Sequence, residues 1–124
     1  MKVAFPLRNK TELAIDFVRC YSIGVYDDTS KQIEYLQYNV KEGYDPEKLC
    51  ETIRLSGADC VVSPSFSCSI LKELEQNNIK TYKAQGEAVE GNIKRLFSKM
   101  LHLFDIFDAL HPDDCPIGCV ACKL

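Results

Sequence analysis

Three cysteines in the last ten residues, CPIGCVACKL, have a spacing that suits metal binding. Cys115, Cys119 and Cys122 follow one another as C-x3-C-x2-C. Thiolates this close in sequence can converge on one metal ion or on an iron–sulfur cluster. A four-ligand zinc site would need one more donor, which His111 could supply. We therefore expect these cysteines to be metal ligands, with an iron–sulfur or other metal cluster as the bound group and zinc as the alternative.

Two other roles for this tail stay open from the sequence. Cys119 and Cys122 form a C-x-x-C pair, which is the spacing of dithiol redox centres. The other alternative is that none of the three cysteines has a functional role. The full C-x3-C-x2-C spacing is that of radical SAM enzymes, but a chain of 124 residues is far shorter than the barrel those enzymes need. We therefore interpret the tail as a ligand set on a smaller protein.

Another cysteine lies in a serine-rich loop, SPSFSCS, at residues 63–69. The loop follows an apolar segment and opens a predicted helix, so Cys68 falls in the first helical turn. Ligands of open α/β sheets bind at the carboxyl ends of strands, and the positive end of a helix dipole lowers a thiol pKa. Ser65 and Ser67 add hydroxyl donors. A capped connection without a ligand is the plain alternative, and with no histidine near Cys68 in sequence, thiol catalysis is poorly supported.

A third group of candidates comes from the segment AIDFVRC at residues 14–20. Asp16, Arg19 and Cys20 bring a carboxylate, a cation and a thiol close to the predicted sheet, where they could line a ligand pocket. The alternative is that Asp16 and Arg19 form a structural ion pair without a ligand, which explains the presence of these two residues equally well.

Composition and charge limit the classes of protein. Hydrophobic residues make up 46% and charged residues 27%, as in globular proteins, and the length suits one ordinary domain. The net charge of −3 argues against a nucleic-acid partner, because neutralising phosphates needs a surplus of Lys and Arg. No apolar run approaches the ~20 residues that cross a bilayer, and the N-terminus lacks the apolar core of a signal peptide. We expect a cytoplasmic protein with no membrane partner.

The seven cysteines should be mostly thiols in a reducing compartment. Cys50 falls on a predicted helix and Cys60 in a predicted strand. Both fit the behaviour of small buried apolar residues, so we assign them no site.

Local patterns predict an α/β domain with a mixed sheet. A strand at 2–6 ends at Pro6, and a hairpin over 20–40 turns at DDTS. A helix capped by Asp45 ends at Gly57. A strand at 59–63, a helix at 68–78, a strand at 79–83 and a helix from about Glu87 complete the order.

The last predicted helix has too much apolar surface for one that only covers a core. Between Leu96 and Leu110, apolar residues occupy more than half of the circumference, whereas a core-facing stripe is about 100° wide or a little more. We expect residues 96–110 either to fold back as a buried second helix or to form a homodimer contact. If the helix ran on to Leu110 it would overshoot the sheet, so contact between the tail and Cys20 or Cys68 requires a break near Ser98–Lys99 or a second subunit.

The stretches MKVAFP, AIDFVRCYSIGVYD and GADCVVSPSFSCSILKELEQNNIKTYKAQGEAVEGNI resemble the nitrogenase iron–molybdenum cofactor biosynthesis family, that is, the dinitrogenase iron–molybdenum cofactor-binding domain. The resemblance covers residues 1–97 and leaves 98–124 as an apolar helical extension with a Cys-rich tail. It implies a ribonuclease H-like α/β fold with a mixed five-stranded sheet flanked by helices. It also implies a protein that carries or delivers metal clusters and is not an enzyme.

Two loops depart from the family pattern. The family has Ser-Glu-His-Phe-Gly-Arg where this chain has residues 14–19, so that Phe17 and Arg19 are kept and Asp16 replaces the histidine. The family's glycine-rich loop aligns with residues 64–69, where the glycines are absent and Cys68 is present. The resemblance therefore implies a changed site that includes Cys68, Cys20, Asp16, Arg19, Ser65 and Ser67.

Taken together, these patterns favour a metallocluster-binding or carrier protein that exchanges its cluster with a donor or acceptor protein. A thiol redox protein that uses Cys119 and Cys122 is one alternative. A metal-free interaction module that dimerises through residues 96–110 is the other.

Overall fold

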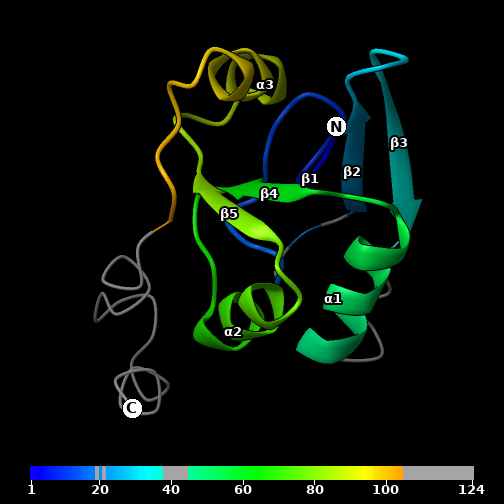
Figure 1. Cartoon of the computed structure of the whole chain (residues 1–124). Helices are drawn as coiled ribbons and strands as arrows, with labels where there is room; N and C mark the ends of the chain where they lie inside the picture. The colour runs from blue at the N-terminus through cyan, green and yellow to red at the C-terminus, as the bar shows by residue number, and fades with distance from the viewer. Residues whose placement is uncertain (19, 21, 38–44, 105–124) are drawn as a thin grey trace.

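The structure is a computed structural model that describes residues 1–18, 20, 22–37 and 45–104 (Figure 1). In this part of the chain, five strands and three helices follow one another in the order β1 (Lys2–Leu7), β2 (Ser22–Asp27), β3 (Gln32–Gln37), α1 (Pro46–Leu55), β4 (Cys60–Ser63), α2 (Cys68–Gln76), β5 (Lys80–Lys83) and α3 (Val89–Phe97). The strands form one sheet in the order β3-β2-β1-β4-β5. Strands β1, β4 and β5 are parallel to one another, whereas β2 is antiparallel to both of its neighbours. The predicted α/β class with a mixed five-stranded sheet is confirmed, and the ribonuclease H-like designation stays a prediction.

Helices cover both faces of this sheet. Helices α1 and α2 lie on one face and α3 lies on the other (Figure 1). Each helix buries an apolar stripe, such as Leu49 and Ile53 on α1 or Leu71 and Leu74 on α2, because residues three and four apart share a helix face. Two apolar clusters result, one on each side of the sheet.

The start of α1 follows the capping rule that the sequence suggested. The Asp45 carboxylate accepts hydrogen bonds from the backbone N–H groups of Glu47 and Lys48, at 3.0 and 3.3 Å, and Pro46 occupies the first turn of α1. Gly57 follows the helix with a φ of +86°, a conformation that glycine adopts without steric cost.

The predicted end of the first strand at Pro6 is wrong, because β1 continues to Leu7. Pro6 pairs with Ile23 of β2, while the pairing with β4 involves only Val3 and Ala4. The missing N–H therefore interrupts no bond to β4. The carbonyl of Pro6 instead accepts a bond from the backbone N–H of Ala14 at 3.0 Å, which directs the following loop back over the end of the sheet.

The predicted helical extension is also wrong over residues 98–104. Helix α3 ends at Phe97, and Lys99 has a φ of +60°, which reverses the chain. The segment then runs beside β5, where Lys83 N–H donates to the His102 carbonyl at 2.9 Å and Phe104 N–H to the Thr81 carbonyl at 2.8 Å. Of the two predicted alternatives, a break near Ser98–Lys99 or a second subunit, the break is present. Residues 105–110 lie outside the described residues.

This reversal has a physical reason. The outer edge of β5 would otherwise expose unpaired backbone groups, and the 101–104 segment supplies partners for them. Leu101 and Phe104 are buried and join the two apolar clusters, one on each side of the sheet. The same chain leaves Met100 and Leu103 each 59% exposed. In the part of the chain that the structure describes, no helix is long and apolar enough to span a membrane.

Candidate functional site

A pocket lies where the three parallel strands end. It has a volume of about 290 Å³ and is lined by residues that follow β1, β4 and β5: Arg8, Leu13, Ala14, Ile15, Pro64, Ala84, Gly86 and Glu87. Parallel strands bring their carboxyl ends to one edge, and ligands of α/β sheets bind there. Ala14, Ile15 and Pro64 belong to the two loops at which the sequence predicts a site, but none of the predicted site residues that the structure describes lines this pocket.

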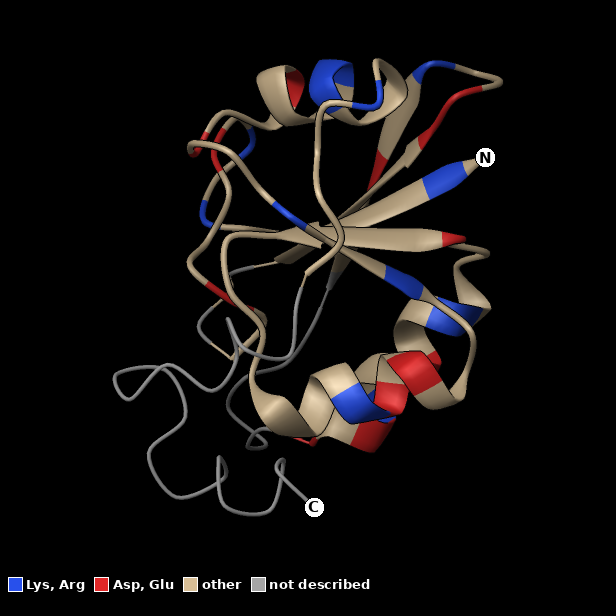
Figure 2. Cartoon of the chain, turned by 60° about the vertical axis from the view of Figure 1, so that its left-hand side comes forward, with Lys and Arg blue, Asp and Glu red and all other residues tan. Residues whose placement is uncertain are grey.

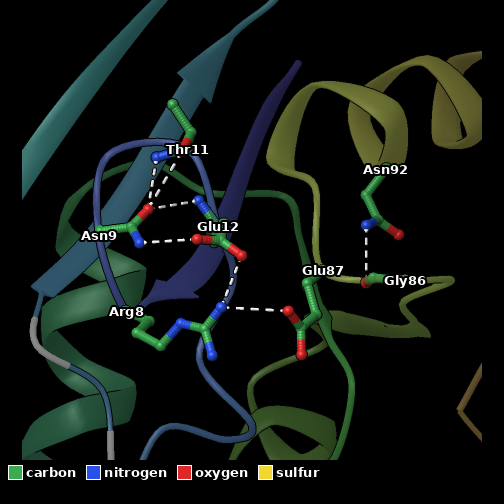
Figure 3. Close-up of polar contacts among 7 residues, drawn as sticks. All are labelled: Arg8, Asn9, Thr11, Glu12, Gly86, Glu87 and Asn92. Carbon is green, nitrogen blue, oxygen red and sulfur yellow. Dashed lines mark hydrogen bonds and ion pairs between the residues drawn. The ribbon is translucent and has the colours of Figure 1, made fainter.

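A short backbone bridge forms one wall of this pocket. Leu13 N–H donates to the Glu87 carbonyl at 2.7 Å, and Val89 N–H donates to the Thr11 carbonyl at 3.0 Å. The loop before the bridge is held by Asn9, whose side-chain oxygen accepts the backbone N–H groups of Thr11 and Glu12 at 3.0 and 2.9 Å (Figure 3). An Asn at a turn forms such bonds readily, and they fix the direction in which Arg8 leaves the sheet.

Arg8 is the one cation among the described residues that line the pocket. Its guanidinium donates to the Glu12 carboxylate at 2.6 Å and to the Glu87 carboxylate at 3.1 Å (Figure 3). Glu12 and then Glu87 raise the pKa of Arg8, whereas the Asn9 amide and then Arg8 lower the pKa of the Glu12 carboxyl. All three side chains are well exposed, so these ion pairs are weak and an anionic ligand could compete for the guanidinium.

Asn92 of α3 fixes the third loop. Its side chain is 2% exposed. Its oxygen accepts from Gln85 N–H at 2.7 Å, and its amide nitrogen donates to the carbonyls of Gly86 and Ala88 at 3.2 and 2.8 Å (Figure 3 draws the bond to Gly86). Gly86 has a φ of +76° at this turn, which disfavours any other residue. One buried amide therefore holds the backbone that carries Gly86 and Glu87 into the pocket.

Cys20 lies in the apolar core and does not line the pocket. It is 2% exposed, its thiol donates to the Phe17 carbonyl at 3.3 Å, and burial raises its pKa to about 11. Phe17, Phe66 and Phe104 pack in the same cluster, with ring centroids 6.2 Å apart for Phe17–Phe66 and 4.8 Å apart for Phe66–Phe104. A protonated thiol in this setting is a poor ligand unless the loop opens.

The other predicted residues of the two loops act in local structure. The Asp16 carboxylate is 8% exposed and accepts from Val18 N–H at 3.1 Å. The Ser65 carbonyl accepts from the Ser63 hydroxyl at 2.6 Å, and Ser67 caps α2 by accepting from Ile70 N–H. Arg19 lies outside the described residues. These contacts shape the loops beside the pocket without adding ligand groups to its lining.

Cys68 is the first residue of α2 and is 8% exposed. It takes part in a disulfide, whereas Cys20, Cys50 and Cys60 carry free thiols. Cys68 shares an apolar cluster with Cys20, as expected for cysteines on neighbouring loops. Cys68 would have to be reduced before it could bind a metal.

The tail cysteines, Cys115, Cys119 and Cys122, lie outside the described residues, as does His111. Among residues 1–18, 20, 22–37 and 45–104, no group of three or more His, Cys, Asp or Glu side chains is placed to hold a metal ion. The described loops therefore offer an exposed guanidinium and one cysteine at a helix start, but not a complete set of metal ligands. Cys50 and Cys60 are each 2% exposed, and their prediction as buried apolar residues is confirmed.

Three residues of the site were missed from the sequence. Arg8 and Glu87 are far apart in the chain, and only the parallel arrangement of β1 and β5 brings them within 3.1 Å. Asn92 occupies an inward position on a predicted helix, where a buried amide between apolar neighbours is a detectable signal.

Comparison with known proteins places this fold. Three solved structures resemble it with TM-scores of 0.71, 0.68 and 0.74: a proposed NifB protein from Thermotoga, a proposed dinitrogenase from Methanocaldococcus jannaschii, and the apo form of the orange protein from Desulfovibrio gigas. Their sequence identities are 20%, 19% and 14%, over 82%, 85% and 83% of this chain and 91%, 95% and 92% of theirs. At these identities the likeness concerns the fold alone.

A search of curated proteins finds no match. The sequence itself matches a family pattern over residues 1–99, which includes every described residue of the pocket and all three helices. The chain therefore belongs to the dinitrogenase iron–molybdenum cofactor family.

Proposed function

We propose that this protein binds a metal–sulfur cluster at the carboxyl edge of its sheet and passes it to another protein. The family match over residues 1–99 carries this proposal, because the family is named for the iron–molybdenum cofactor of dinitrogenase. The pocket of about 290 Å³ between the loops of β1, β4 and β5 supports it, since it lies at the edge where such sheets bind ligands.

The ligand set combines one cysteine of the domain with those of the tail. Cys68 lies at the start of α2, where the helix dipole favours a thiolate. Cys115, Cys119 and Cys122 supply the remaining thiolates, and an iron–sulfur cluster is the preferred cargo because iron binds thiolates well. Zinc, with His111 as a fourth ligand, is the alternative. Arg8 contributes positive charge beside an anionic cluster and binds no metal.

Release of the cargo takes place by thiolate exchange with a donor or acceptor protein. Each cysteine of the partner replaces one cysteine of this chain, so no metal–sulfur bond is lost overall. The protein carries the cluster and converts no substrate. The Cys68 disulfide must first accept two electrons from a thiol reductant, which makes loading dependent on reducing conditions.

The test is reconstitution of the reduced full chain with iron and sulfide in the absence of oxygen. We expect a broad visible absorption band together with bound iron and sulfide. Replacement of Cys115, Cys119 and Cys122 by Ser should abolish the band, and Cys68→Ser should weaken it. Cys50→Ala is the matched control, because Cys50 is a buried thiol of α1 that lines no part of the pocket. A colourless, metal-free protein after reconstitution would overturn the proposal.

The disulfide at Cys68 also favours a second candidate, a thiol redox protein. In that case Cys119 and Cys122 act as a dithiol pair and Cys68 exchanges with them. Mass measurement after alkylation at defined redox potentials separates the two functions: a reversible two-electron couple without metal binding supports the redox protein.

Homodimerisation is the third candidate function. Phe97, Met100 and Leu103 are 38%, 59% and 59% exposed, so part of the predicted apolar surface of residues 96–110 is uncovered. Light scattering of the full chain and of Met100→Ser/Leu103→Ser tests it, since a dimer that uses this surface should dissociate in the variant.

A further inference from the structure

A second pocket lies on the opposite side of the 11–13/87–89 bridge. It has a volume of about 550 Å³ and is lined by the 10–11 loop, the hairpin β2–β3 and the start of α3: Lys10, Thr11, Tyr26, Lys31, Ile33, Ala88, Val89, Glu90, Ile93 and Lys94. Within the part of the chain that the structure describes, its lining shares no residue with that of the candidate cluster site. The volume falls within the range of about 300–1,000 Å³ typical of small-molecule sites.

The base of this pocket is apolar. Tyr26 and Ile33 come from neighbouring strands, where they pair across the hairpin, and Val89 and Ile93 come from one side of α3. Val89 is buried, whereas Tyr26, Ile33 and Ile93 are half-buried. A ligand that covers the exposed part of this apolar surface removes it from water, which favours binding.

The rim of the pocket is positively charged although the whole chain has a net charge of −3. Three lysines contribute to the lining against one carboxylate, that of Glu90. Figure 2 shows basic residues on α3 and at the turn of the hairpin, at the same end of the molecule.

These lysines are available for an anion. Lys94 pairs with Glu90 at 3.4 Å and Lys31 with Asp28 at 3.9 Å, and all four side chains are well exposed. Such pairs contribute little stability and are readily exchanged. Lys10 has no ion-pair partner within the described ranges of the chain.

We infer that this second pocket binds a small amphipathic anion, in which one phosphate or carboxylate group is attached to an apolar body about the size of a ring system. The apolar body lies against Tyr26, Ile33 and Ile93, and the anionic group meets the lysines of the rim. This site is independent of the proposed cluster binding, because neither its lining nor its ligand includes a thiol or a metal.

The test uses the reduced full chain, free of metal, in amide NMR titrations. 2-Naphthyl phosphate and naphthalene-2-carboxylate are the probes, because they share one apolar ring system and differ in their anionic group. The ring half is supplied by 2-naphthol, and the anionic halves by inorganic phosphate and acetate. We expect 2-naphthyl phosphate or naphthalene-2-carboxylate to shift the amide signals of Thr11, Lys31, Val89 and Ile93. Each should bind at least about fivefold more tightly than its own two halves, because the two contacts add. The anionic group that binds more tightly identifies the source of the ligand.

Variants separate a local site from the overall charge. Lys10→Gln/Lys31→Gln/Lys94→Gln should weaken binding at least about tenfold. The matched control is Lys48→Gln/Lys72→Gln/Lys80→Gln, which changes the net charge equally at exposed lysines that do not line the pocket, and it should bind normally. Ile33→Thr, which keeps a β-branched residue in β3, should weaken both aromatic probes and leave the response to phosphate unchanged.

Several results would overturn the inference. One is the absence of amide shifts with either amphipathic probe at millimolar concentration. Another is an equal loss of binding in the two lysine variants, which would indicate a nonspecific charge effect. Shifts confined to Arg8, Ala14 and Ile15 would assign the anion to the first pocket instead.

Discussion

Replacing Asn92 by Ala should destabilise the protein and release the loop that carries Glu87 into the candidate cluster site. Asn92 makes three hydrogen bonds to backbone groups of residues 85, 86 and 88, at 2.7, 3.2 and 2.8 Å. A hydrogen bond of this kind contributes about 1 kcal/mol net, and a buried group left without a partner costs about 1–3 kcal/mol. The Ala88 carbonyl also accepts a hydrogen bond from the Asn92 backbone N–H at 3.2 Å, and this bond remains in the variant. The Ala88 carbonyl therefore keeps one of its two partners.

These contributions predict a decrease of about 2–4 kcal/mol in the free energy of unfolding. Urea denaturation followed by circular dichroism measures it. Amide hydrogen exchange should show faster exchange at Gln85, whose N–H loses its acceptor, and little change in β1, where pairing with β2 is untouched.

Asn77→Ala is the matched control because the same substitution is made at an exposed site. The Asn77 amide donates to the Glu73 carbonyl at 2.8 Å at the end of α2, where water can replace it. We expect a cost below about 1 kcal/mol there. The reasoning is refuted if Asn92→Ala costs no more than Asn77→Ala, or if Gln85 exchange is unchanged.

Three further predictions concern packing and charge. Gly24→Ala should cost about 1–3 kcal/mol of unfolding free energy by urea denaturation, because an added Cβ would clash with the ring of Phe5. Burial raises the pKa of the Cys20 thiol to about 11, so the folded state holds this proton more tightly than the unfolded state does. The resulting contribution to the free energy of unfolding is complete below the ordinary thiol pKa and is lost as pH rises towards 11. Cys20→Ala should therefore make the free energy of unfolding less dependent on pH in that range. The Glu12 carboxyl should titrate below its usual range by carbon NMR, because Asn9 and Arg8 stabilise its ionised form, and Arg8→Gln should raise that pKa.

Each of these predictions has a contrary outcome. Gly91→Ala lies in a helix, where the added Cβ would meet the flexible end of Arg95 and, at ordinary contact distance, the Ala88 Cβ, so it should be neutral or stabilising. An equal loss at Gly24 and Gly91 would argue against a clash. An unchanged alkaline slope in Cys20→Ala would mean that Cys20 does not titrate differently on unfolding. An ordinary Glu12 pKa, unaffected by Arg8→Gln, would show that the ion pair does not persist in solution.

Much of the fold was predictable because its elements have local causes. Asp45 and Pro46 start α1, Ser67 caps α2, and the Asp-Thr-Ser turn closes the hairpin, as expected from their side chains alone. The end of α3 was not predictable in this way. Apolar residues after Phe97 continue a helical pattern, but the open edge of β5 favours an extended segment, and only the tertiary structure creates that edge.

The candidate site likewise has one part that was predictable from the sequence and one part that was not. The loops after β1 and β4 that line it were predictable, because α/β sheets bind ligands at the carboxyl ends of their parallel strands. Cys68, at the start of α2, is not among the residues that line the pocket. Cys20 was predicted as a ligand because cysteine is a common metal ligand. The sequence does not show that Cys20 is buried in the same apolar cluster as Phe17 and Phe66.

What the sequence determined by itself is local: where helices begin, which segments alternate as strands, and which family pattern residues 1–99 follow. The tertiary structure decided which side chains share a cavity. Arg8 meets Glu87 because the crossover connections bring the loops after β1 and β5 to one edge. Lys10 joins Lys31 and Lys94 around one pocket because α3 packs on the sheet beside the β2–β3 hairpin. Charge, burial and pKa depend on such neighbours through space, and spacing along the chain does not specify them.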